Sequence, residues 1–84
     1  MLEQYRPNPF NPSTTIRYAL PYTSPVTLTM YSTLAQEVAQ LVNEQQQPGF
    51  HEVVFRGDGL ATGVYFYRLD AGQFTSVKKV LLLK

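Results

Sequence analysis

The sequence contains no cysteine and no tryptophan among its 84 residues. Without thiols, no disulfide can stabilise the fold, and the redox compartment cannot be inferred from cysteine usage. Charged residues are few and scattered, and the formal net charge is only +1. Because a nucleic-acid surface usually needs a clustered basic patch, this balance argues against nucleic acid as a partner.

Long apolar runs are also missing. The run at residues 80–83 is far shorter than the roughly 20 residues of a membrane-spanning helix, so we expect no membrane span. No basic and then apolar signal peptide opens the chain. Residues 1–4 are interpreted as an expression start or linker remnant, and residues 5–84 as one domain.

Residues with catalytic or metal-binding chemistry are scarce. His51 is the only histidine, and without cysteine it cannot complete the usual zinc site of three or four protein ligands. We therefore expect His51 in the core or at a sheet edge. The glycines at 57, 59 and 63 precede a predicted strand rather than opening a helix, which favours turns over a phosphate loop. The sequence predicts no enzyme, no catalytic residue, no cofactor and no metal.

The stretch from Gly57 to Leu69 is the centre of the pattern. Its second half, Val64 to Leu69, is apolar on both faces except at Arg68 and contains three consecutive aromatic residues. Such composition favours a strand in the middle of a sheet, with the core on one face and some cover on the other.

Alternating apolar residues predict further strands. They lie at 14–20, 26–31, 50–56 and 74–84, with loops at 21–25, 43–49 and 70–73. The proline-rich segment 5–13 is expected to form an extended arm with Phe10 in the core, or else a linker. The residues expected to be largely buried are Ile16, Leu28, Val53, Phe55, Tyr65 and Leu69.

Residues 32–43 allow two interpretations. Leu34, Val38, Leu41 and Val42 have helical spacing, whereas the position between strands favours a turn at 32–36 and then a strand through Val42. We favour the turn and strand. About seven short strands without a convincing helix then predict an all-β fold, a small antiparallel immunoglobulin-like β-sandwich.

Three blocks of sequence resemble one protein family. Residues 5–16 (YRPNPFNPSTTI) resemble the opening of the type A C-terminal sorting domain of the bacterial type IX secretion system. Residues 59–69 (GLATGVYFYRL) resemble its central signature, and residues 78–84 (KKVLLLK) its terminal motif. The resemblance covers residues 5–84 and implies an immunoglobulin-like sandwich related to one in flagellar hook-capping proteins.

The chain departs from the family's pattern in one turn. Where the family usually has Asp or Asn and then Gly, this chain has Ser32 and Ala35. Because alanine resists the positive φ that glycine allows, the departure gives some weight to the helical alternative.

The resemblance implies a non-catalytic secretion signal. Its partners would be the type IX translocon, a sortase-like peptidase and the cargo domain that precedes it, and its route would lead through the periplasm to the cell surface or medium. The alternative is a carbohydrate-binding or spacer β-sandwich module, which sugar-affinity electrophoresis would separate from a signal. For the glycine and the aromatic residues, a role in the fold is favoured over contact with the machinery. The candidate recognition residues are Pro7, Asn8, Pro9, Phe10, Gly63, Val64, Tyr65, Lys78, Lys79 and Lys84.

Overall fold

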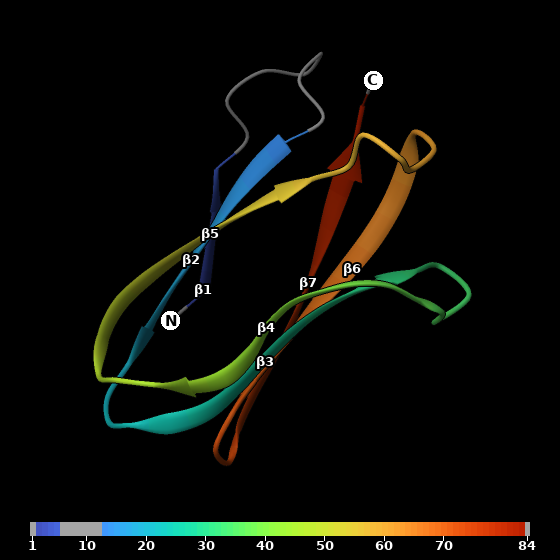
Figure 1. Ribbon diagram of the computed structural model, residues 1–84. Helices are drawn as coiled ribbons and strands as arrows, with labels where there is room; N and C mark the ends of the chain where they lie inside the picture. Colours follow the sequence, from blue (N-terminus) through green and yellow to red (C-terminus); the bar gives the residue numbers. More distant parts are fainter. Residues whose placement is uncertain (1, 6–12, 84) are drawn as a thin grey trace.

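The computed structural model describes residues 2–5 and 13–83, and these residues form two antiparallel sheets (Figure 1). One sheet has the strand order β1-β2-β5 and the other β4-β3-β6-β7. The two sheets face each other, and in the larger sheet β6 lies between β3 and β7. This is the immunoglobulin-like arrangement expected from the sequence. The strands are β1 (Leu2–Tyr5), β2 (Ser13–Leu20), β3 (Ser24–Ser32), β4 (Glu37–Gln46), β5 (Gly49–Arg56), β6 (Gly63–Ala71) and β7 (Phe74–Leu82).

A long two-stranded ribbon passes through both sheets. β2 pairs with β5 in one sheet, and the same two chain segments continue as β3 paired with β4 in the other. The ribbon bends where residues 21–23 lie beside Gln47 and Pro48 (Figure 1). Pro21 and Pro48 lack the N–H needed to continue a ladder, and the Thr23 hydroxyl donates to Gln47 Oε1 across the bend at 3.3 Å. At this bend, both chain segments therefore pass from one sheet to the other.

The turn at residues 32–36 joins β3 to β4 and confirms the favoured interpretation. The Ala35 amide donates to the Ser32 carbonyl at 3.0 Å, and the Ser32 amide donates to the Gln36 carbonyl at 2.8 Å. The Ser32 hydroxyl also accepts from the amides of Leu34 and Gln36, at 3.2 and 3.3 Å. A three-residue loop ending in a left-handed residue is a common hairpin connection, and serine suits its first position. The helical alternative is wrong.

Ala35 occupies the left-handed position of this turn, with a φ of 62°. That conformation costs a residue with a Cβ about 1–2 kcal/mol, and glycine loses about 0.5–1 kcal/mol in entropy on folding. We expect Ala35→Gly to raise the free energy of unfolding by about 0.5–1 kcal/mol, measured by urea denaturation. The matched control is Ala39→Gly in β4, which should lower it, because glycine weakens a strand. Equal effects of the two substitutions would contradict this account of the turn.

β4 is longer than the sequence predicted. The loop expected at 43–49 is wrong, because β4 continues to Gln46 and β5 begins at Gly49. Its polar residues tolerate a strand because β4 is an edge strand of its sheet. The Tyr18 hydroxyl donates to Gln46 Oε1, and Gln46 Nε2 donates to Glu44 Oε2 at 3.1 Å, so the polar side chains satisfy one another. The loop expected at 70–73 likewise shortens to Gly72 and Gln73.

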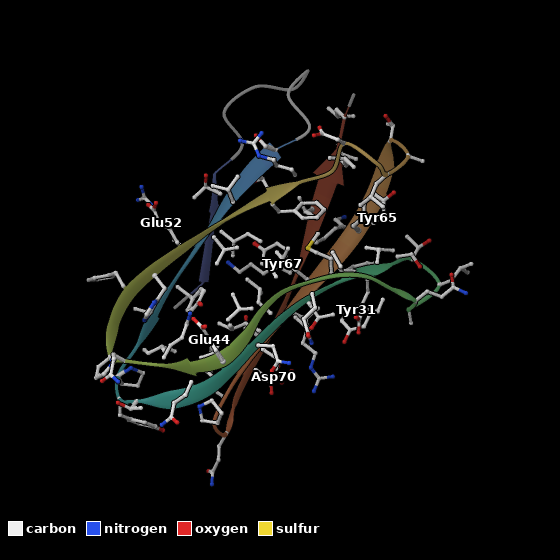
Figure 2. The ribbon with its side chains drawn as sticks, viewed as in Figure 1. Tyr31, Glu44, Glu52, Tyr65, Tyr67 and Asp70 are labelled. Carbon is white, nitrogen blue, oxygen red and sulfur yellow. The ribbon has the colours of Figure 1, made fainter. Side chains whose placement is uncertain are left out.

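The core lies between the sheets, as Figure 2 shows for Tyr67. Of the six residues expected there, five are buried, whereas Val53 of the edge strand β5 is only partly buried. Phe10, also expected in the core, lies outside the described residues. The buried hydrophobic residues are Ile16, Tyr18, Leu20, Val26, Leu28, Met30, Val42, Phe55, Tyr65, Tyr67, Leu69, Ala71, Val80 and Leu82.

Burial raises the pKa of Tyr67 from 10.0 to about 12. Between these values the unfolded chain releases the phenolic proton while the folded domain keeps it, so stability is complete below pH 10 and falls as the pH rises towards 12. We expect the fall to reach about 2–3 kcal/mol, because the pKa rises by about two units and one unit corresponds to about 1.4 kcal/mol. Tyr67→Phe should flatten this part of the stability profile, whereas Tyr22→Phe, which alters an exposed ring, should not. Identical profiles for both variants would contradict the prediction.

Candidate functional site: the β7 edge

β7 is an edge strand of the four-stranded sheet. It pairs with β6 along its whole length, from Ala71 opposite Phe74 to Gly63 opposite Leu82. Among residues 2–5 and 13–83, no strand pairs with its other side. The second row of backbone N–H and C=O groups is therefore available to a strand from another chain. β6 lies between β3 and β7, in the middle of the sheet, as its composition predicted.

Lys78 and Lys79 lie on opposite faces of this edge, because neighbouring residues of a strand alternate in direction. Lys79 is opposite Phe66 on the outer face, and Lys78 is opposite the buried Tyr67 on the inner face. Both lysines are exposed. All three lysines of the sequence lie within its last seven residues, and the third, Lys84, is outside the described part. A lysine on the inner face of an edge strand also discourages unwanted strand pairing.

The outer face beside the edge carries four apolar side chains in addition to Lys79 and Arg68. We call Val64, Phe66, Val77 and Leu81 the outer strip. Val64 pairs directly with Leu81, and Phe66 lies one position further along the same face, opposite Lys79. Val77 is 57% exposed, Leu81 38% and Val64 36%. The cover predicted for this face of β6 is not supplied by the residues that the structure describes.

A shallow hollow of about 390 Å³ adjoins the outer strip. It is lined by Phe66 and Val77 together with Tyr31, Arg68 and the turn that contains Ala35. Tyr31 and Asp70 lie on the side of the sheet away from the core (Figure 2). Arg68 Nε lies 3.0 Å from Asp70 Oδ2, so the positive charge of Arg68 is balanced locally. Lys78 and Lys79 are the two positively charged residues of β7.

The central signature contributes mainly to the fold. Tyr65 is buried, and its hydroxyl donates to the Ala61 carbonyl at 2.7 Å. A tyrosine that bonds back to the preceding loop as the chain changes sheet corresponds to the tyrosine corner of immunoglobulin-like domains. Gly63 begins β6 opposite Leu82. Of the three candidate recognition residues Gly63, Val64 and Tyr65, only Val64 lies in the outer strip.

The structure places Lys78 and Lys79 on opposite faces of the β7 edge, and Val64 on the outer face of the neighbouring strand β6. Pro7, Asn8, Pro9, Phe10 and Lys84 lie outside the described residues. Sequence reasoning missed Phe66, Val77 and Leu81. Val77, Lys79 and Leu81 alternate with Lys78, Val80 and Leu82, and this alternation could have identified Val77 and Leu81 as outward-facing. The unbroken apolar run at 80–83 concealed it.

Other kinds of site find no support in the described part of the chain. His51 stacks on Tyr18 with ring centroids 5.4 Å apart, and its Nε2 lies 2.8 Å from the Gln47 carbonyl oxygen, which confirms its expected place at the sheet edge. Across residues 2–5 and 13–83, no three histidine, cysteine or acidic side chains gather as metal ligands. These residues also contain no helix long and apolar enough to cross a membrane.

Comparison with protein-family models gives a match over nearly the whole chain. The model described as "Secretion system C-terminal sorting domain" matches residues 5–83. The chain belongs to this family. A search among curated proteins finds no match.

Membership of the sorting-domain family confirms the resemblance found in the sequence. The domain is a secretion signal for its cargo and is not catalytic. The protein that carries it is secreted or displayed at the cell surface, and the domain interacts with secretion machinery.

Proposed function

We propose that the type IX translocon recognises this domain at the β7 edge, after the domain has folded in the periplasm. The observation that carries the proposal is that one strand, β7, is an exposed sheet edge, bears two exposed lysines and contributes Val77 and Leu81 to the outer strip. The other sheet shows a different combination, because the exposed side chains along β5 include a glutamate and an arginine.

The edge suits recognition by strand addition. In this mode, main-chain hydrogen bonds supply affinity, and pockets for alternate side chains supply specificity. On β7 the alternate outward side chains are Val77, Lys79 and Leu81. A translocon subunit that adds a strand would therefore contact two apolar side chains with a lysine between them. The lysines would in addition steer an acidic receptor towards the edge.

The remaining steps of the proposal follow the family. A sortase-like peptidase removes the domain from its cargo after transport, and the cargo reaches the cell surface or the medium. Residues 7–10, which are outside the described part, and Lys84 stay candidate recognition residues on the strength of the family's opening and terminal motifs.

The test replaces the charges without changing the strand. We expect Lys78→Gln with Lys79→Gln to lower export of a reporter fused upstream by about tenfold, which corresponds to about 1.4 kcal/mol of binding free energy. The melting temperature should change by at most about 2–4 °C, because surface substitutions usually change stability by less than about 0.5 kcal/mol.

The charge-matched control is Arg17→Gln with Arg56→Gln, which removes two exposed cations from the other sheet. Export of this control should stay at the level of the unchanged domain. If both double variants export equally well, the lysines serve only to keep the edge soluble. If both lose export to the same degree, net charge matters rather than the β7 edge.

A further inference from the structure

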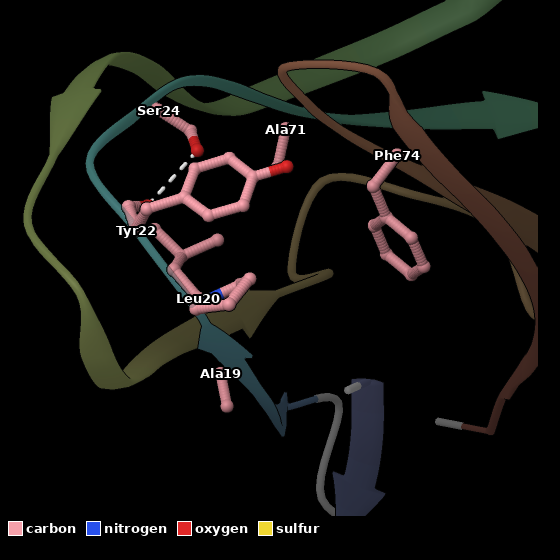
Figure 3. Close-up of a pocket in the computed structure, with 7 residues that line it drawn as sticks. Ala19, Leu20, Tyr22, Ser24, Ala71 and Phe74 are labelled. Atoms are coloured by element: carbon pink, nitrogen blue, oxygen red, sulfur yellow. Dashed lines mark hydrogen bonds between the residues drawn. The ribbon is translucent and has the colours of Figure 1, made fainter.

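A second apolar surface lies at the end of the sandwich where the ribbon changes sheet. Its hollow of about 290 Å³ is lined by Ala19, Leu20, Pro21, Tyr22, Ser24, Ala71 and Phe74 (Figure 3). None of these side chains is charged. Tyr22 is 62% exposed and Phe74 48% exposed, so two aromatic rings border an opening to solvent.

Hydrogen bonds hold the walls of this hollow in place. The Ser24 hydroxyl donates to the Tyr22 carbonyl at 3.0 Å (Figure 3). The Gly72 amide donates to the Pro25 carbonyl at 3.2 Å, which ties the β6–β7 loop to the start of β3. The hollow is thus formed before anything enters it. Its volume lies at the lower limit for small-molecule sites, which are about 300–1,000 Å³, and so suits one or two side chains better than a cofactor.

The register of β1 directs the incoming chain towards this hollow. Leu2 pairs with Tyr18, and the two strands are antiparallel. Each step upstream from Leu2 therefore corresponds to one step downstream from Tyr18. Continued in the same register, the chain before Leu2 would pass Ala19, Leu20 and Pro21, all of which line the hollow.

We propose that the linker between cargo and domain packs an apolar side chain into this hollow, between Tyr22 and Phe74. The family places the cargo before the sorting domain, so a linker enters at this end. Leu82, which pairs with Gly63, lies at the opposite end of β7 from Phe74. The docked linker shields its last residues from proteases while the domain is attached. This proposal depends on family membership and not on recognition at the β7 edge.

The experiment compares this chain with a version extended by about 15 residues of its parent protein, long enough as a flexible linker to span about 20 Å. The extension should raise the melting temperature by about 4 °C or more, as expected for a gain near 1 kcal/mol in a domain of this size. Amide NMR signals of Leu20, Tyr22 and Phe74 should shift, and non-specific proteolysis of the linker should be slower than in a denatured control.

Two alanine variants test whether the linker binds in this hollow. Phe74→Ala should abolish the gain in melting temperature from the extension, whereas Phe50→Ala should leave it intact. Phe50 is 93% exposed and is not part of the lining. No gain on extension, or an equal gain in Phe74→Ala, would overturn the proposal. A concentration-dependent dimer that Phe74→Ala dissociates would also overturn it, because the hollow would then bind a second copy.

Discussion

Leu28→Ala is expected to lower the free energy of unfolding by about 2–5 kcal/mol, the usual result of opening a cavity in a packed core. Leu28 is 0% exposed and lies in β3, between Val42 of β4 and Leu69 of β6. Neither neighbouring strand can move inward without breaking its own ladder, so the cavity would remain. Phe55→Ala should have an effect of the same order from the facing sheet, where Phe55 is 3% exposed.

This loss is comparable to the whole stability of a small domain, because the free energy of unfolding of proteins is about 0.05–0.15 kcal/mol per residue. Urea denaturation followed by circular dichroism measures the effect. Leu34→Ala is the matched control, because Leu34 is 78% exposed in the β3–β4 turn and its loss should cost less than about 0.5 kcal/mol. If the Leu28 and Leu34 variants had the same denaturation midpoint, the assigned core would be wrong.

The second large effect is expected on export. Val77→Thr with Leu81→Thr should reduce export of a fused reporter by more than about tenfold, because a Val or Leu side chain gains about 1.5–3 kcal/mol when a partner buries it fully. Threonine is β-branched, as valine is, and β-branched residues suit a strand. Since both side chains are exposed on the outer face, the melting temperature should change little.

The control makes the same change on the other sheet. Phe50 is 93% exposed and Val54 is 54% exposed on β5. Phe50→Thr with Val54→Thr should leave export unchanged. Equal loss of export in both double variants would show that general surface hydrophobicity, rather than the outer strip, determines export.

The sequence predicted the strands best where one face is buried. Alternation placed Ile16, Leu28 and Phe55 in the core, because a period of two leaves one register that buries them. The consecutive aromatic residues Tyr65, Phe66 and Tyr67 indicated the central position of β6 for a different reason, because they make both faces of the strand apolar.

Alternation failed where a strand is polar or where a run is apolar throughout. β4 beyond Val42 resembles a loop in the sequence, and only its pairing with β3 and the bond from Tyr18 to Gln46 make it a strand. At β7, the apolar run gave no sign that Leu81 points outward while Val80 and Leu82 point inward.

The candidate site was predictable only in part. The lysines and Val64 were found from the family's motifs, but a motif does not distinguish a residue that holds the fold from one at the surface. Tyr65 and Val64 are neighbours in one motif, yet Tyr65 is buried with its hydroxyl bonded to Ala61, and Val64 faces outward. That the strip borders an exposed edge follows from long-range pairing of β6 with β3 and β7, which no local pattern encodes.

The most direct test of the central claim is export of a reporter that carries this domain at its C-terminus. The reporter, with its own signal peptide, would be produced in a bacterium with a type IX system and in the same strain without a working translocon. We predict that it reaches the cell surface or medium only in the first strain and accumulates in the periplasm of the second. If the folded fusion stays in the periplasm of the secretion-competent strain, the domain does not act as the proposed signal.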